Sequence, residues 1–219
     1  MKYPLLLALF SVGVLLFAGF YFVSRILYKS RHKENYHFYR MFPYEFNYPA
    51  VFKENMWGNI IFILASFAMV AFYILNPYES VYKTIAIVIS IVFTMISLCL
   101  LLMPLRYLRT HLVLSVVGMT LPLALALFNL FLAHTEYKAT NEAICIVSMV
   151  VSGILTLIML VLILNPKLTF KIYLDKTVDD SGKEVLKRPR VIFLALNEWV
   201  SIFVYFLTPL SILLISFVI

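Results

Sequence analysis

Charged residues at the ends of apolar segments are the strongest candidates for chemistry in this sequence. Glu198 or His111 could act as a general acid or base, and arginine can pair bidentately with a phosphate group. We expect these groups to gather as one candidate anionic headgroup cluster: Arg25, Arg106, Arg109, Arg188, Arg190 and Glu198, with His111 beside them. The same arginines are typical anchors of membrane helices, and the sequence favours that interpretation over a specific headgroup or substrate site.

A second candidate is a stripe of small and polar residues between positions 111 and 133. Its members recur every three or four residues and so share one helix face: His111, Ser115, Gly118, Pro122, Ala126, Asn129 and Ala133. Polar side chains in membrane helices face the bundle interior or a cavity. The stripe therefore predicts an inward face. We favour a packing seam, with a polar cavity near Pro122 and Asn129 as the functional alternative.

Shorter polar stripes with helical spacing occur in four other apolar segments. They are Asn59, Ser66 and Tyr73; Ser90, Thr94 and Ser97; Ser148, Ser152 and Thr156; and Asn197, Ser201, Thr208 and Ser211. We expect them to point inward as well, where small residues let helices approach closely and hydroxyl groups bond between helices.

The sequence patterns of several common active sites do not occur. There is no His-Glu-x-x-His zinc motif, no Gly-x-Ser-x-Gly elbow and no glycine-rich phosphate loop. Cys99 and Cys145 stand alone, the histidines offer no opposed pair for haem, and Asp175, Asp179 and Asp180 lack the spacing of a calcium loop. We therefore predict no catalytic residue, no metal and no cofactor, and lean toward a non-enzymatic protein.

Long uncharged segments must position these residues. The chain is 63% hydrophobic and only 13% charged, and six uncharged runs of 21 to 26 residues punctuate it. Each can cross a bilayer, because a hydrocarbon core about 30 Å thick needs about 20 helical residues. The first run is too long for the apolar core of a signal peptide. We predict an all-α integral membrane protein, a bundle of six transmembrane helices over about 4–28, 57–76, 83–104, 110–133, 143–165 and 191–219.

Lysine and arginine set the expected orientation. Loops 29–56, 105–109 and 166–190, with the helix ends beside them, hold 15 of the 18 basic residues; the other three are Lys2, Lys83 and Lys138. Basic loops stay in the cytoplasm, so we expect a multi-pass cell-membrane protein with both termini outside. The net charge of +7 then faces anionic lipids of the inner leaflet, which accounts for it without a nucleic-acid partner.

The two larger cytoplasmic loops have different patterns. Aromatic residues alternate over 42–48 between two prolines, which predicts an extended segment with one aromatic edge at the membrane interface. Apolar residues alternate over 170–174 before turn-forming residues at 179–182, which predicts a small β-hairpin-like loop between the fifth and sixth helices.

These features favour a non-enzymatic, multi-pass subunit of a transport or envelope-associated complex. Its cytoplasmic loops would contact a membrane or cytoplasmic protein partner or the inner leaflet, since little polar chain is left outside. One alternative is a self-sufficient small-solute transporter, or solute-binding membrane component, that uses the stripe from His111 to Asn129. The other is a membrane enzyme acting on a lipid headgroup at the cytoplasmic face through Glu198 or His111.

Overall fold

The computed structural model describes residues 2–48, 52–77, 81–103, 108–168, 175–178, 184–187 and 189–217. Six helical spans within them are long and apolar enough to cross a membrane. The helices are α1 (Lys2–His32), α2 (Met56–Leu75), α3 (Val81–Leu102), α4 (Leu108–Thr140), α5 (Ala143–Ile163), and α6 (Phe193–Leu207) with α7 (Pro209–Ile215) as one interrupted span. The chain is a multi-pass membrane protein in a lipid bilayer.

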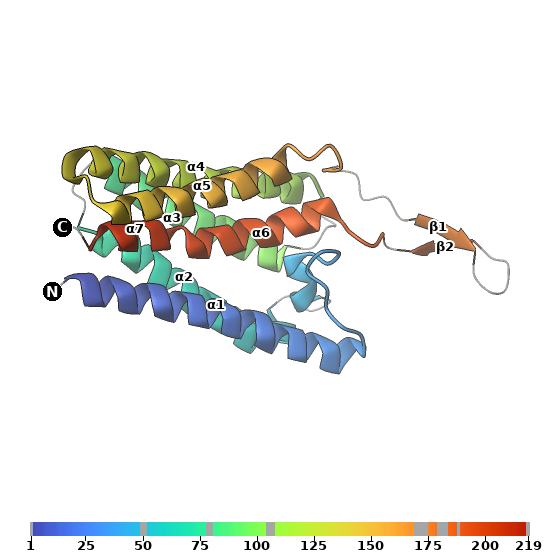
Figure 1. Ribbon diagram of the computed structural model, residues 1–219. Coiled ribbons are helices and arrows are strands. Elements are labelled where there is room, and N and C mark those ends of the chain that lie inside the picture. The colour runs from blue at the N-terminus through green and yellow to red at the C-terminus, as the bar shows by residue number, and fades with distance from the viewer. Residues whose placement is uncertain are drawn as a thin grey trace.

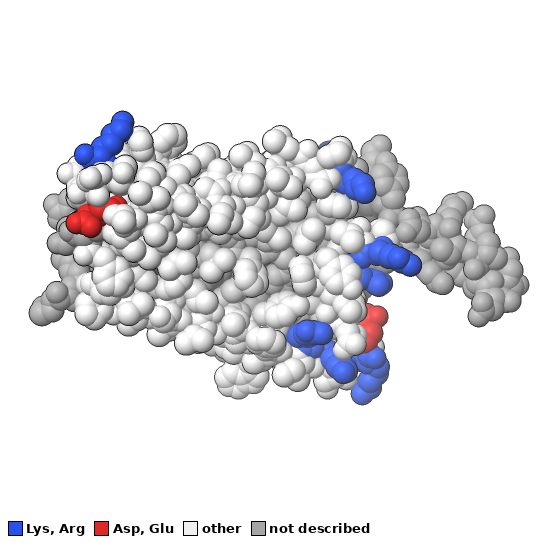
Figure 2. Space-filling view, in the orientation of Figure 1, with Lys and Arg blue, Asp and Glu red and all other residues white. Residues whose placement is uncertain are grey.

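The helices run side by side, and both ends of the described chain lie at the same end of the bundle (Figure 1). The rings of Tyr3 and Phe217 are 3.9 Å apart there. Most of the visible lysine and arginine side chains lie at the opposite end (Figure 2), called the basic end below. The span formed by α6 and α7 is the most buried of the six and α1 the least, so α6 and α7 form the centre of the bundle.

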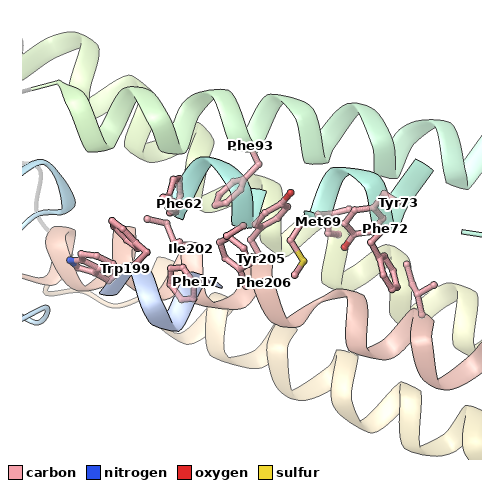
Figure 3. Packing of buried hydrophobic residues seen from close by; sticks show 14 of the residues in the cluster. Phe17, Phe62, Met69, Phe72, Tyr73, Phe93, Trp199, Ile202, Tyr205 and Phe206 are labelled. Atoms are coloured by element: carbon pink, nitrogen blue, oxygen red, sulfur yellow. The ribbon is translucent and has the colours of Figure 1, made fainter. Parts of the chain in front are cut away.

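Packing inside the bundle is largely aromatic. Phe17 of α1 stacks on Phe206 of α6 with ring centroids 4.4 Å apart, and Phe93 of α3 lies 4.5 Å from Tyr205. Figure 3 shows these rings along α6 between Trp199 at one end and Phe72 and Tyr73 of α2 at the other. Large apolar side chains such as Leu15 are exposed, as expected where a helix faces acyl chains rather than water.

The sixth span, predicted over about 191–219, consists of two helices. The span begins at Phe193 and is divided at Thr208, because Pro209 has no N–H to donate to the carbonyl of Tyr205. The Thr208 hydroxyl replaces that donor and bonds to the Tyr205 carbonyl oxygen at 2.8 Å. Asn129 Nδ2 of α4 donates to the Thr208 carbonyl oxygen, also at 2.8 Å. Side chains thus satisfy the backbone at the break, as lipid cannot.

The extended aromatic segment predicted over 42–48 is wrong. Pro43–Asn47 forms a 3-10 helix, η1, and a second one, η2, covers Lys53–Asn55. The turn forms because the Glu45 carboxylate accepts the Phe42 N–H at 2.8 Å while the Glu45 N–H donates to the Phe42 carbonyl at 3.0 Å. Phe42 and Phe46 are consequently buried, whereas Tyr48 is exposed.

Residues 36–47, called the aromatic cap, close the basic end of the bundle. Trp199 Nε1 donates to the Tyr36 hydroxyl at 2.9 Å, and that hydroxyl donates to the Phe42 carbonyl at 2.8 Å. Asn47 and Asn59 exchange amide hydrogen bonds at 2.7 and 3.2 Å, which joins the cap to α2. Burial raises the pKa of Tyr36 well above its usual range, since the phenolate would lie in an apolar environment.

Two short strands follow α5. β1 (Asp175–Val178) and β2 (Glu184–Lys187) pair antiparallel, with Asp175 opposite Lys187 and Val178 opposite Glu184. The turn predicted at 179–182 and the alternation predicted at 170–174 lie outside the described residues.

Candidate functional site

A completely buried acid and base meet between α4 and α6. His111 lies in the first turn of α4 and Glu198 in the second turn of α6. His111 Nε2 lies 3.0 Å from Glu198 Oε1, and both side chains have zero exposure. The helix rise places Glu198 about 7 Å inside α6 from Phe193, so the pair belongs to the membrane-spanning part of the bundle, near its basic end.

The hydrogen-bond partners of His111 constrain where its hydrogens can lie. Its Nδ1 lies 3.2 Å from the Met103 carbonyl oxygen, which can only accept, so this contact is a hydrogen bond when Nδ1 carries a hydrogen. The contact between His111 Nε2 and Glu198 Oε1 is a hydrogen bond when a hydrogen lies between those two atoms. A neutral imidazole has one hydrogen and can satisfy only one of these two acceptors, whereas one further proton in the pair satisfies both.

Ser115 adds a movable hydroxyl to the pair. Its Oγ is 2.5 Å from Glu198 Oε1 and 2.8 Å from the His111 carbonyl oxygen. A hydroxyl has one proton, so it can donate to the carboxylate or turn to the carbonyl and accept from a protonated carboxyl. Ser115 donates to the acid and not to the imidazole, so this geometry does not activate it as a nucleophile in the manner of a hydrolase triad.

A cavity of about 10 Å³ adjoins Glu198, about the space that one water molecule requires. Its lining includes Ser97 of α3 and Ser115, Glu198 and Ser201 of α4 and α6. Glu198 Oε2, Ser97 Oγ and Ser201 Oγ are buried without a hydrogen-bond partner among the described residues. A single water molecule in this cavity could form hydrogen bonds with all three of these groups.

Aromatic rings of the cap cover the pair from the basic end. Phe42 and Tyr44 both place their rings 5.8 Å from the imidazole of His111, in edge-on contact. Tyr36, another titratable residue of the cap, hydrogen-bonds to Trp199 of α6. The pair is therefore closed to the aqueous phase at this end in the observed conformation.

Further polar side chains follow the same face of α6 and α7 away from Glu198. The Tyr205 hydroxyl lies 2.5 Å from Ser90 Oγ, and Thr208 Oγ1 lies 2.9 Å from the Tyr73 hydroxyl. Ser211 Oγ bonds to serine hydroxyls of α5 at 2.6 and 2.7 Å. Polar groups thus recur from the pair to α7, mostly one helical turn apart.

The structure buries every member of the stripe predicted on α4, from His111 through Ser115, Gly118, Pro122 and Asn129. Beside Pro122 and Asn129 the interior is hydrogen-bonded: Asn129 donates to the Thr208 carbonyl and accepts from the Tyr82 hydroxyl. In this part of the stripe, away from the basic end, the polar side chain of Asn129 is used in hydrogen bonds between helices. At the other end, His111 and Ser115 belong to the ionisable site.

The predicted headgroup cluster needs correction at Glu198. Arg25, Arg109 and Arg190 are exposed, whereas Glu198 is buried and paired with His111. The reason is the helix face: Glu198 shares its side of α6 with Ser201 and Tyr205, which point toward α3 and α4. Arg106 and Arg188 lie outside the described residues.

The sequence analysis named His111 and Glu198 as alternative acid or base groups and placed them in one cluster, but it did not predict that they form a buried pair. His111 begins a polar stripe and Glu198 lies next to Asn197 of another, but stripes on separate helices do not reveal their relative rotation. Comparisons with protein-family models, curated proteins and solved structures find no match to this chain. In the described part of the chain, no group of three or more His, Cys, Asp or Glu could hold a metal.

Proposed function

We propose that this protein is a multi-pass membrane component of a transport system, with Glu198, His111 and Ser115 as its proton-binding centre. The observation that carries the proposal is the fully buried His111–Glu198 pair within the spans. Ionisable residues inside membrane helices are rare and costly, and where they occur they mark ion pathways and proton relays.

Stability alone is a weak reason for such a pair. Desolvation costs several kcal/mol for each buried ion, and apolar residues of similar volume at the same positions often give a folded protein that is equally stable or more stable. The site also has features that suit proton exchange. The Ser115 hydroxyl can rotate between two acceptors, and Glu198 lines a water-sized cavity while its Oε2 has no hydrogen-bond partner among the described residues.

The mechanism follows from the shared proton. With the shared proton present, α4 and α6 are joined at the 3.0 Å contact; after its release, the neutral imidazole has one hydrogen for two acceptors, the Glu198 carboxylate and the Met103 carbonyl, so the site loses one hydrogen bond and the helix contact is weakened. The break at Thr208–Pro209 lets α6 move with limited disturbance of α7. Proton binding is thereby coupled to the packing of the central span, as alternating access requires.

The proposed orientation places the basic end in the cytoplasm and both termini outside, because lysine and arginine are concentrated at that end and basic loops stay in the cytoplasm. The aromatic cap and the paired strands β1 and β2 then lie on the cytoplasmic side, where a partner subunit could bind. The protein would act either alone or as the membrane subunit of a complex, and its size after extraction in mild detergent distinguishes these two forms.

Infrared difference spectroscopy across a pH titration tests the proton-binding centre. We expect a carboxyl C=O band that Glu198→Gln removes and Glu54→Gln retains, because Glu54 is a partly exposed partner of Arg31. Proton entry into liposomes containing the protein, driven by a potassium diffusion potential, should likewise be lost in Glu198→Gln only. Absence of a Glu198-dependent band, or equal proton entry in both variants, would refute the proposal.

A further inference from the structure

An apolar groove opens on the side of the bundle between α1 and α6. Its volume is about 390 Å³, and its lining is almost entirely apolar and rich in aromatic rings. α1 contributes Phe17, Tyr21 and Phe22, and α6 contributes Trp199 and Phe203. Phe22 and Phe203 are 60% and 54% exposed, which shows that the groove opens outward, toward the space that lipid occupies.

Two exposed arginines lie beyond the lining residues toward the basic end, Arg25 after those of α1 and Arg190 before those of α6. Arg25 follows Tyr21 by one helical turn on the same face of α1 and is exposed. Arg190 is also exposed and lies two residues before Ile192, whose N–H donates to the Tyr39 carbonyl at 2.9 Å. Tyr39 adjoins Phe38, the cap residue that lines the groove. Among the side chains that the structure describes, neither arginine forms an ion pair with a carboxylate.

The length of the groove, together with the position of Arg25, indicates its occupant. From Val14 to Phe22, which line the groove, the helix rises about 12 Å, and Arg25 lies almost one turn further, about 16 Å from Val14. This is about half the hydrocarbon thickness of a bilayer, or one leaflet. An acyl chain of a phospholipid has this reach, whereas a partner transmembrane helix would contact the full thickness. Arg25 and Arg190, at the basic end, then lie at the depth of the lipid headgroups and carry the charge opposite to that of an anionic headgroup.

We propose that this groove binds one acyl chain of an anionic phospholipid, whose phosphate is held by Arg25 and Arg190. The aromatic residues contact the chain, and the guanidinium groups supply charge-assisted hydrogen bonds to the phosphate oxygens. The site lies on the lipid-facing side of α6, and Glu198 lies on the inner side, so the inference is independent of the proposed proton-binding centre.

Quenching of Trp199 by brominated lipid tests this site. The chain has two tryptophans, so Trp57→Phe leaves Trp199 as the single reporter. The protein is placed in phosphatidylcholine bilayers that contain the same small fraction of either dibrominated phosphatidylglycerol or dibrominated phosphatidylcholine. We expect stronger quenching by the phosphatidylglycerol, with an enrichment of about fivefold for each arginine. Unbrominated phosphatidylglycerol should compete, and inorganic phosphate should not.

Matched variants separate a specific site from general attraction. Arg25→Gln with Arg190→Gln should reduce quenching by phosphatidylglycerol to the phosphatidylcholine level. Lys29→Gln with Lys53→Gln removes the same charge from exposed positions at the same end and should leave it unchanged. Ala18→Phe, which fills the groove, should reduce quenching by both lipids. Equal quenching by the two lipids in the parent protein, equal loss in the two double variants, or no effect of Ala18→Phe would overturn the proposal.

Discussion

The buried pair can be tested by replacing His111 and Glu198 with methionine, singly and together. Each single change leaves one ionisable group with zero exposure and without its 3.0 Å partner. Removal of one member of a buried pair costs about 3–5 kcal/mol. Replacement of both by apolar residues of similar volume is often neutral or stabilising. We therefore expect each single variant to lose about 3–5 kcal/mol and the double variant to recover most of it.

The assay is the free energy of unfolding in mixed detergent micelles, measured for the four proteins of the cycle. Strong non-additivity is the expected signature, because the two changes remove the same interaction. The double variant should be folded and inactive in proton uptake, which separates stability from function. Single losses below about 1 kcal/mol that simply add would refute the tight buried pair and the mechanism based on it.

Three further predictions concern the surroundings of the site. Gly118→Val should cost about 1–3 kcal/mol of unfolding free energy, because a Cβ there would lie 3.3 Å from Ile96 Cγ2. The control in the same thermal assay is Gly153→Ala, where an added Cβ would have nothing within 4 Å. Equal effects of the two changes would contradict this contact. Thr208→Val should cost about 1–3 kcal/mol, since it removes the donor to the Tyr205 carbonyl; an unchanged melting temperature would show that the break needs no such donor. Burial raises the pKa of Tyr36, so its stabilising contribution is complete below the unfolded-state pKa of about 10 and is lost as the pH rises through the higher folded-state pKa. Unfolding free energy measured against alkaline pH should therefore fall less steeply in Tyr36→Phe than in the wild type, and identical slopes would contradict the assignment.

Several features of the bundle could be predicted without coordinates because they depend on local spacing. A polar residue in a lipid-facing position is costly, so the period of three and four along α4 already predicts which side faces inward. The same reasoning applies to Ser148 and Ser152 of α5, both of which are buried against Ser211.

The aromatic cap shows where local patterns mislead. Alternation over 42–48 is compatible with an extended segment, and nothing nearby in the sequence opposes it. The 3-10 turn is favoured because Phe42 and Phe46 can be buried together on the ends of the helices and Asn47 can reach Asn59 and the Leu101 carbonyl. Contacts 12 and 54 residues apart are not visible in a seven-residue window.

The sequence by itself determined that this chain crosses a bilayer several times, which faces of its helices are polar, and where its positive charge gathers. Those properties follow from segment length, helical period and the cost of placing charge in hydrocarbon. Only the tertiary structure decided that His111 and Glu198 meet, because their contact depends on how α4 and α6 are rotated and shifted relative to each other. The two residues are 87 positions apart, and no periodicity specifies that relation.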